Sequence, residues 1–598
     1  MSGPLQAIKK RTFKGVEFTP VNEADSLTYR LWVKIISYGS LICTLIYGLI
    51  LFWPTGWVVF LNPISPQTPA NWLILLCLLT LQCFVLFGTY SAVRATVLAR
   101  NPIPLRPLPG QRVAFVTTRA PGEPIDMVET TLTAAKSVIY TTGTVDVWLL
   151  DETDSAELKA ICSNLDVRYF TRARDPQWRQ LKPDQSRLRR VAQFVKIVKA
   201  PPYDPKFAAK TKHGNFNAWI AHLALRDITY DIVAGVDTDQ VPHPNYLQRL
   251  LGYFNDPDIA FVVGPQVYGN YKPGIMGLVT RWSESQASFF QAVIQRAGNA
   301  SHSAMLVGTN YAIRMSVIKQ IDGFQPCITE DMATGLVIHA NSNMLTGNPW
   351  KSVYTPDVLA IGEGPSSWSS YFSQQWRWAA GTFDTWRRLV WRVFPRYSLA
   401  RILHYLLILS FYPIVALTWL LAVISSGLYL ILGASAVNAS FSHVLSLYLI
   451  CMVLQLSLYF WSRRFNVSPH EPSGSLGLAG MAMTSLTGPI YLSALIGVAL
   501  GKRATFVVTK KGSEATRDGL RTFKISIGWF MVMAVFVGYG AQHAHTNLVM
   551  LSWAILTTVL CIVPVVLGLR IKVPQGTLRR FALRRPSSGG SVLQESRS

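Results

Sequence analysis

Seven long apolar segments constrain what this chain of 598 residues can fold into. They run over residues 35–53, 72–93, 403–430, 444–461, 476–500, 525–539 and 549–569, so a long stretch of mixed polarity separates the first two from the last five. Most are close to the roughly 20 apolar residues that a helix needs to cross a bilayer. The sequence therefore predicts a membrane protein whose soluble domain is inserted between transmembrane helices.

Basic residues are distributed unevenly among the connections between these segments. Three connections contain no Lys or Arg, namely residues 54–71, 433–443 and 540–547. The opposite ends carry basic pairs, as at Arg463–Arg464 and Lys502–Arg503. By the positive-inside rule these basic ends are cytosolic, together with both termini and the soluble domain.

The segment 476–500 has cytosolic markers at both of its ends and contains Pro489. We therefore predict that it lies in the cytosolic interface as a helix or a pair of helices, which leaves six membrane crossings. The alternative is a seventh span that inverts the rest of the C-terminal half.

The formal net charge of +24 also fits a membrane protein. In such proteins a basic excess usually lies in cytosolic loops that face anionic lipid, so we expect the lipid bilayer and no nucleic acid as a partner. The seven cysteines show no C-x-x-C spacing. This pattern indicates neither a zinc site nor a disulfide framework.

Short β-rich runs alternate with helical ones in the soluble stretch. Strands are predicted over 112–117, 145–150, 232–236 and 259–263, and a helix over 127–138. This alternation is typical of a largely parallel sheet with helices on its faces. In such sheets ligands bind at the carboxyl ends of the strands, so the residues that follow each strand carry the functional prediction.

Two of these strands end in carboxylates. One strand is followed by Asp151 and another by the D-x-D sequence of Asp237 and Asp239. Two hard oxygen donors suit Mg²⁺ or Mn²⁺ that bridges a diphosphate. The alternative for an isolated D-x-D is a solvated turn.

A third acidic motif, Thr329-Glu330-Asp331, precedes a predicted helix over 332–339. A carboxylate there can act as a general base toward an attacking hydroxyl. The alternative is an ordinary helix N-cap, a position that Thr and acidic residues favour.

The last motif, Gln374-Gln-Trp-Arg377-Trp378, lies in an aromatic stretch just before the membrane. Arg377 offers a planar fork for phosphate oxygens, and Trp378 offers a flat face on which a sugar ring can pack. The alternative is an interfacial aromatic belt with an arginine that reaches toward water.

In this order the four motifs resemble those of the processive members of glycosyltransferase family 2, which include the chitin and hyaluronan synthases and the catalytic subunit of bacterial cellulose synthase. The resemblance to cellulose synthase is the strongest and covers about residues 111–569. Segments 241–245, 261–270 and 307–309 look like its sequence after D-x-D, and 506–511 (Phe-Val-Val-Thr-Lys-Lys) looks like its gating loop.

The resemblance implies an α/β fold of the GT-A type, with a mixed, mostly parallel sheet, inserted between about six transmembrane helices plus interfacial helices. The implied parts are a cytosolic tail (1–30), two transmembrane helices (31–100), the glycosyltransferase domain (101–388), two more transmembrane helices with an interfacial helix (389–500), the gating loop (501–520), two last transmembrane helices (521–571) and a basic cytosolic tail (572–598).

The resemblance also implies a role for each matching residue. Asp331 would be the catalytic base, and Asp237 and Asp239 would hold the metal ion, Mg²⁺ or Mn²⁺. The nucleotide-sugar would be bound by Glu123, Asp151, Lys212, Asp237, Gln374, Arg377, Thr509 and Lys511, and the acceptor by Trp378, Glu330, Gly308 and Thr309.

The implied activity is that of a processive, inverting glycosyltransferase in the cell membrane. It would polymerise a β-glucan (β-1,4, mixed-linkage or β-1,3) from UDP-glucose and translocate the growing chain. The alternatives are a chitin-, hyaluronan- or mannan-like product from another nucleotide-sugar, or a non-processive transfer to a lipid acceptor. A transporter is disfavoured because the spans hold few charges and no evident inverted repeat.

The sequence departs from the cellulose synthase pattern in three places. Asp151-Glu152 stands where family members often have two aspartates, and two spans rather than four precede the catalytic domain. The stretch after Arg570 is too short for the β-barrel that binds cyclic-di-GMP in the bacterial enzyme. We read the basic residues there as a lipid-surface tail and expect no direct control by cyclic-di-GMP.

Overall fold

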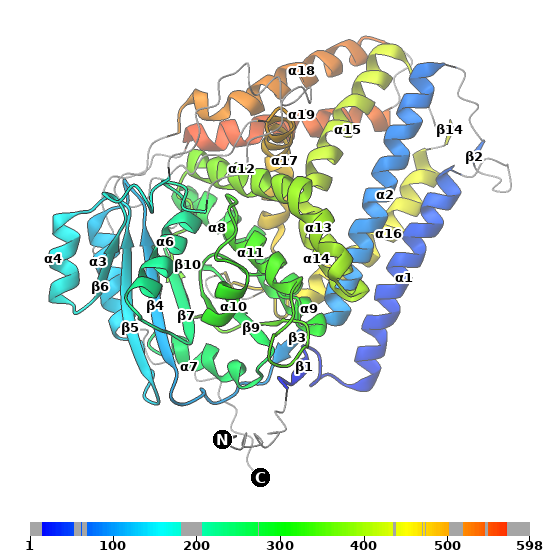
Figure 1. The fold of residues 1–598 in the computed structure, drawn as a ribbon. Helices are drawn as coiled ribbons and strands as arrows, with labels where there is room; N and C mark the ends of the chain where they lie inside the picture. The colour runs from blue at the N-terminus through cyan, green and yellow to red at the C-terminus, as the bar shows by residue number, and fades with distance from the viewer. Residues whose placement is uncertain are drawn as a thin grey trace.

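The computed structural model of the chain describes residues 15–52, 61–62, 68–180, 206–272, 274–434, 438–439, 441–468, 471–472, 474–501, 518–543 and 548–570. A sheet domain with helices on both of its faces lies beside a group of long helices from the two ends of the chain (Figure 1). This arrangement confirms the predicted soluble domain inserted between apolar helices.

The central sheet has seven strands in the order β12-β9-β11-β7-β4-β5-β6. Their bounds are β4 Arg112–Arg119, β5 Thr144–Asp151, β6 Arg168–Thr171, β7 Ile232–Asp237, β9 Ile259–Val263, β11 Tyr311–Arg314 and β12 Lys351–Tyr354. Strand β11 runs antiparallel to both of its neighbours, and all other neighbouring pairs are parallel. The predicted mixed, mostly parallel sheet and its four predicted strands are confirmed.

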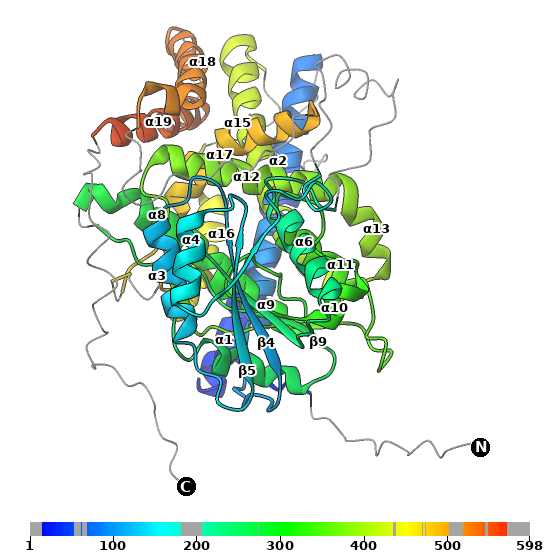
Figure 2. The ribbon, with the colours of Figure 1, turned by 60° about the vertical axis from the view of Figure 1, so that its left-hand side comes forward.

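Helices cover both faces of this sheet because its strands are apolar on both sides. On β4, Phe115 packs on one side with α3 (Ile125–Lys136) and α4 (Ala156–Asn164), and Val116 packs on the other. That second side is covered by α6 (Lys212–Leu225), α10 (Met315–Gln320) and α11 (Glu330–His339), as Figure 2 shows. Strands buried on both faces are expected in parallel sheets covered by helices.

A smaller three-stranded sheet with the order β10-β13-β8 adjoins the main one. It consists of β8 (Gln240–Pro242), β10 (Val267–Tyr268) and β13 (Ala360–Gly362). Strand β8 begins directly after Asp239, and β13 leads into α12 (Trp368–Thr385). The small sheet therefore connects the D-x-D segment to the helix that carries Gln374, Arg377 and Trp378.

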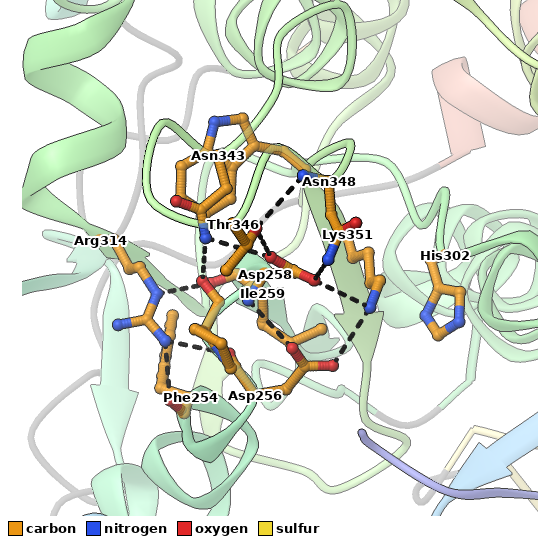
Figure 3. Close-up of polar contacts among 12 residues, drawn as sticks. Phe254, Asp256, Asp258, Ile259, His302, Arg314, Asn343, Thr346, Asn348 and Lys351 are labelled. Atoms are coloured by element: carbon orange, nitrogen blue, oxygen red, sulfur yellow. Dashed lines mark hydrogen bonds and ion pairs between the residues drawn. The ribbon is translucent and has the colours of Figure 1, made fainter. Parts of the chain in front are cut away.

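A polar network at the start of β9 and β12 fixes the end of the sheet opposite the D-x-D (Figure 3). The buried carboxylate of Asp258 accepts hydrogen bonds from Asn343, Thr346 and Asn348 and forms an ion pair with Lys351 at 3.3 Å. The first three partners lie in the turn between α11 and β12, and Lys351 begins β12. This one carboxylate therefore holds the turn against the sheet.

Six helices of the described chain are long and apolar enough to cross a membrane. They cover Leu27–Ile50 of α1 (Leu27–Phe52), α2 (Pro69–Leu98), α15 (Phe411–Leu432), α17 (Leu478–Ala499), Leu520–Ala541, which includes α18 (Lys524–Ala541), and Met550–Leu569 of α19 (Leu548–Arg570). The predicted segment 403–430 is wrong as one helix, because the helix breaks at Ser410 between α14 (Leu399–Leu409) and α15. Pro413 in the next turn has no N–H for a continuous helix.

The helix α17 differs from the other candidates in how deeply it is buried. Its most apolar window is 56% buried, against 17–33% for the other five, and it packs against α8 (Leu278–Phe289), α12 and α15. Its length and composition fit a span, so the predicted interfacial placement stays a prediction. The predicted span 444–461 corresponds to α16 (Phe441–Ser462), a helix of 22 residues.

Contacts between distant segments agree with the topology derived from the loop charges. Strand β2 (Leu61–Asn62) pairs with β14 (Asn438–Ala439), so two connections predicted to be non-cytosolic meet. At the helix ends that were predicted to be cytosolic, Asp25 forms an ion pair with Arg464 at 2.7 Å, and β1 (Phe18–Pro20) pairs with β3 (Arg100–Pro102). The start of α1 and the ends of α2 and α16 therefore lie on one side.

We predict that Asp258→Ala destabilises the protein by about 3 kcal/mol, because it removes a buried ion-pair partner and leaves several amide and hydroxyl donors unpaired. Chemical unfolding of the detergent-solubilised protein measures this loss. Lys136→Ala is the matched control, because Lys136 pairs with an almost fully exposed Asp166. This control should cost under about 1 kcal/mol. Equal losses for the two variants would contradict the role given to Asp258.

Candidate active site

The carboxyl ends of the parallel strands bring the predicted acidic residues to one edge of the sheet. In the strand register Arg119 lies opposite Asp151, and Thr118 lies opposite Asp237. Because β11 runs antiparallel, its beginning meets the end of β7, where Tyr311 pairs with Gly235. Gly308 and Thr309, just before β11, therefore reach the same edge.

A cavity of about 950 Å³ opens at this edge and continues to the apolar helices. It is lined by eleven of the predicted site residues, namely Glu123, Lys212, Asp237, Asp239, Gly308, Thr309, Glu330, Asp331, Gln374, Arg377 and Trp378. Its other end is lined by side chains of α2, α15, α16 and α17, among them Phe87, Tyr412, Tyr459 and Met481. Residues that are far apart in the sequence thus share one cavity.

Lys212 lies at the centre of the acidic cluster. Its Nζ is 2.5 Å from Asp237 Oδ1 and 3.9 Å from Glu330 Oε1, and it donates a hydrogen bond of 2.6 Å to the carbonyl of Gly308. Burial by itself lowers the pKa of Lys212, but the carboxylates of Asp237 and Glu330 outweigh it and raise this pKa. Lys212 is therefore a permanent cation.

The start of α6 places this lysine. Thr211 is the N-cap of α6, and its hydroxyl accepts a hydrogen bond from Gly214 N. The preceding segment is held by buried Arg172, which pairs with Glu152 and donates to the carbonyls of Phe207 and Ala208. Glu152 itself lines the cavity.

Glu330 and Asp331 occupy the first turn of α11, as the predicted helix requires. Burial raises the pKa of both carboxyl groups. Thr329 holds the N-cap position but makes no side-chain cap hydrogen bond. Asp331 Oδ1 accepts a hydrogen bond from the adjacent Met332 N, and Asp331 lines the cavity. Its carboxylate therefore faces the cavity from the first turn of the helix.

Two glycines allow close approach at this point. A Cβ on Gly308 would lie 2.8 Å from Asp331 Oδ2, and a Cβ on Gly381 of α12 would lie 2.5 Å from Thr329 Cγ2. A larger side chain would displace the Asp331 carboxylate at the first position and the Thr329 side chain at the second. The small residues therefore let three elements meet at Asp331.

The helix α12 carries Gln374, Arg377 and Trp378 along one face toward the cavity. Burial lowers the pKa of Arg377 to about 10, which still leaves it a cation at neutral pH. Gln374 Oε1 is buried and has no hydrogen-bond partner in the described part of the chain. These polar groups are suited to an anionic ligand with hydroxyl groups.

Asp151 is placed differently from the other predicted residues. It is fully buried and does not line the cavity, because its carboxylate accepts hydrogen bonds from Thr153 N, Ser155 N and the Tyr169 hydroxyl. Burial alone raises its pKa, but these hydrogen bonds outweigh burial and lower it. Asp151 also pairs with Arg119 at 3.3 Å, and Arg119 does line the cavity. Direct contact between Asp151 and a nucleotide stays a prediction.

Several residues that line the cavity were not predicted from the sequence, among them Arg119, Gln266 and Glu363. Arg119 ends β4, which is the position where a ligand contact is expected in a parallel sheet. Glu363 stands between two glycines just before α12, and its N–H donates to Asp239 O. The strand end and the Gly-Glu-Gly sequence are the signals that could have identified these two residues.

The predicted loop residues Thr509 and Lys511 lie outside the described residues. The next described residue, Asp518, contacts α12 directly. Its carboxylate accepts hydrogen bonds from Trp368 N at 2.9 Å and Ser369 N at 2.8 Å, the first N–H groups of that helix. A carboxylate at this end satisfies free N–H groups and interacts favourably with the helix dipole.

The residues at the end of β7 can hold a divalent cation. Asp237 and Asp239 both line the cavity, and two carboxylates suit Mg²⁺ or Mn²⁺ when phosphate oxygens complete the coordination. Among the described residues there is no cluster of three or more His, Cys, Asp or Glu side chains arranged for a metal. The chain thus supplies part of a coordination shell and leaves the rest to a ligand.

A family model for "Glycosyl transferase family group 2" matches residues 232–463. This segment includes the D-x-D, the turn with Asp331 and the face of α12 that carries Arg377. The predicted resemblance is confirmed, and the fold is of the predicted GT-A type. The chain is a membrane protein that carries a glycosyltransferase family 2 segment and is related to cellulose synthases and glucomannan synthases.

Three curated relatives illustrate the similarity. A cellulose synthase catalytic subunit of Dictyostelium discoideum is 30% identical over 30% of this chain and 16% of its own length. A cellulose synthase catalytic subunit of Xanthomonas axonopodis pv. citri is 25% identical over 48% of this chain and 33% of its own length. A probable glucomannan 4-beta-mannosyltransferase of Oryza sativa subsp. japonica is 30% identical over 30% and 32%. The matches span about a third of these relatives or less.

Among solved structures, the chain is similar to a mannosyltransferase, PcManGT of Pyrobaculum calidifontis, in complex with GDP-Man and Mn²⁺. The TM-score is 0.42 with 12% sequence identity, and the match covers 72% of this chain and 98% of that one.

We predict that Asp518→Ala lowers both the stability and any transferase activity of the protein. The loss of a capping carboxylate costs about 1 kcal/mol. Because α12 carries Gln374, Arg377 and Trp378, the cap also fixes their position. Thr68→Ala is the control, because Thr68 caps α2 by accepting from Asn71 N and lies outside the cavity lining. It should lower the unfolding midpoint similarly and leave the activity unchanged.

We also predict an unusual pH profile. A general base works in its deprotonated form, so the raised pKa of Asp331 means that activity is lost as the pH falls through a value above the usual carboxyl pKa of about 4. The profile of kcat at saturating donor measures this acidic limb. Lys212→Met should move the limb to higher pH, because the lysine lowers the pKa of both Glu330 and Asp331. A limb near pH 4 in the native protein would contradict this prediction.

Proposed function

We propose that the protein is a processive, inverting glycosyltransferase that builds a β-linked polysaccharide from a nucleotide-sugar and passes it across the membrane. The single observation that carries this proposal is the shared cavity. It joins the carboxylates at the sheet edge to the cationic face of α12, which carries Arg377. It also includes an aromatic wall on the apolar helices, formed by Phe87, Tyr412 and Tyr459. A nucleotide-sugar needs the carboxylates and the cationic face, and a growing saccharide chain needs the aromatic wall.

In this proposal Asp331 removes the proton from the acceptor hydroxyl, which then attacks the anomeric carbon in a single displacement. Its raised pKa makes it a stronger base than an ordinary carboxylate. Arg377 and Lys212 stabilise the negative charge that builds on the leaving nucleoside diphosphate. One displacement converts an α-linked donor into a β-linkage.

Asp237 and Asp239 would hold Mg²⁺ or Mn²⁺ together with the diphosphate, and the ion would supply positive charge at the leaving group. The nucleoside part would lie near Glu123 and Arg119, where Glu123 accepts from Ala120 N and Arg119 donates to Glu123 O. In this arrangement Asp151 acts through Arg119, whose guanidinium it holds. Thr509 and Lys511 keep their predicted role at the nucleotide.

The acceptor end of the saccharide would pack on Trp378, beside Gly308, Thr309 and Glu330. From there the cavity leads to Tyr412 of α15, Tyr459 of α16 and Phe87 of α2. Aromatic faces bind sugar rings without strong directional hydrogen bonds, so a chain can slide over them. This wall supports processive synthesis over a single transfer to a lipid acceptor.

We favour UDP-glucose as the donor and a β-glucan as the product, because the motifs resemble cellulose synthase most closely. A second donor, GDP-mannose, is supported by the similarity to a probable glucomannan 4-beta-mannosyltransferase. We place the protein in the cell membrane, with the sheet domain and both termini in the cytosol, on the basis of the charged connections.

The test uses purified, reconstituted full-length protein with Mg²⁺ or Mn²⁺ and radiolabelled UDP-glucose, UDP-N-acetylglucosamine or GDP-mannose. Polymer from one donor, digested by a linkage-specific glucanase, chitinase or mannanase, names the substrate and the linkage. Donor hydrolysis or single-sugar transfer without polymer from any donor would contradict processive synthesis.

Asp331→Asn tests the catalytic base. We expect donor binding within about 3-fold of the native protein and turnover reduced at least about 100-fold, because the amide cannot accept the proton. Isothermal titration with the nucleoside diphosphate measures binding, and incorporation of labelled sugar measures turnover. The variant Asp166→Asn, at an exposed position outside the cavity lining, is the control. Substantial polymer from Asp331→Asn would remove Asp331 from this role.

A further inference from the structure

A closed network of side-chain hydrogen bonds joins α8, α12 and α17. The Tyr371 hydroxyl donates to Gln286 Oε1 at 2.7 Å and lies 2.9 Å from Thr487 Oγ1. The Tyr491 hydroxyl donates to Gln375 Oε1 at 2.7 Å and accepts from Gln286 Nε2 at 3.3 Å. Gln286 is thus the node that connects the two tyrosines.

The network is buried except at Gln286, which is partly buried. Tyr371 and Tyr491 are fully buried, and Gln375 is 4% exposed. The ring of Tyr491 also packs edge-on against Tyr412 with ring centroids 4.9 Å apart. Buried polar groups that are all satisfied hold their elements in one arrangement, because any displacement leaves a donor or acceptor without a partner.

The position of the network on α12 gives it a functional consequence. Tyr371 and Gln375 are four residues apart and share one face of the helix, whereas Gln374 and Trp378 are four apart on the adjacent face. Gln286 and Gln375 also line the cavity. A rotation or shift of α12 would therefore break the network and move Gln374, Arg377 and Trp378 together.

We propose that Tyr371 and Tyr491 are positioning residues, which act through Gln286 and Gln375 to hold α12 in the register that catalysis requires. The proposal rests on the proposed function, because the side chains that α12 positions are those assigned to the diphosphate and the acceptor. The helix that carries them is fixed from the membrane side by α17 and from the sheet domain by α8.

The first experiment does not depend on catalysis. Amide hydrogen exchange is measured over α12 in the full-length, detergent-solubilised protein and in Tyr371→Phe, Tyr491→Phe and the double variant. Phenylalanine keeps the ring packing and removes only the hydroxyl. We expect backbone exchange over residues 371–378 to become roughly 5- to 10-fold faster in each single variant. The reason is that the side-chain amide of Gln286 or of Gln375 loses its hydrogen-bond donor. Unchanged exchange would overturn the proposal.

The matched control is Tyr230→Phe. Tyr230 is a buried tyrosine whose hydroxyl donates to Asp146 and accepts from Trp148 Nε1, and it precedes β7 at the end of the strand opposite Asp237. This variant also loses two hydrogen bonds of one hydroxyl. It should leave exchange over α12 and sugar transfer unchanged, and faster exchange in α12 there would indicate a general loss of stability and overturn the proposal.

The second experiment measures sugar transfer with the donor that the native protein uses. We expect kcat to fall roughly 10-fold in each single variant with a donor KM within about 3-fold, since the binding groups remain and only their alignment changes. The loss in the double variant should be smaller than the product of the two single losses, because both hydroxyls share Gln286 as a partner. Native kcat in both single variants would overturn the positioning role.

The two experiments separate this inference from the proposed function. If the native protein transfers no sugar from any donor, the proposed function fails, and the exchange experiment alone decides whether the network holds α12. If the native protein is active and exchange over α12 is unchanged in the variants, the positioning role fails and the proposed function stands.

Discussion

The ammonium group of Lys212 is the interaction on which the candidate site depends. It binds the carboxylate at the end of β7, the carbonyl of Gly308 before β11 and, at longer range, Glu330 at the start of α11. Without this cation three segments would bring like charges and a carbonyl dipole together in a buried place. Its position follows from the capped start of α6. Arg172 fixes the segment before that helix, because it pairs with Glu152 and donates hydrogen bonds to two backbone carbonyls of the segment.

A second constraint is the placement of α12 between the sheet domain and the apolar helices (Figure 2). Asp518 caps its start, α17 packs along it, and Gly381 lets it touch the turn that carries Asp331. The helix α12 therefore contacts Asp518, α17 and the turn at the start of α11 at the same time. A displacement on the membrane side would reach the acidic turn and the cationic face together, which links the cavity near the sheet to the aromatic wall among α2, α15 and α16.

The sequence predicted the fold well where a pattern is local. The strands that end at Asp151 and Asp237 have continuous apolar runs with flanking turns, and they lie where they were expected. The break at Ser410 was missed because the residues on both sides are apolar, so hydropathy continues through it. The burial of Asp151 was missed for a different reason. A carboxylate after a strand indicates a ligand, and only the neighbouring Thr153, Ser155 and Tyr169 turn it into an internal acceptor.

The sequence by itself determined the class of the chain, because apolar length, loop charge and the order of four motifs are one-dimensional properties. It identified eleven residues that line one cavity, since each lies in a motif or at a strand end. The tertiary structure alone decided which groups meet: that Lys212 pairs with Asp237, that Arg119 and Glu363 join the lining, and that Tyr371 and Tyr491 share Gln286. These contacts join residues up to about 200 positions apart, and no local pattern encodes a pairing that depends on how helices pack against a sheet.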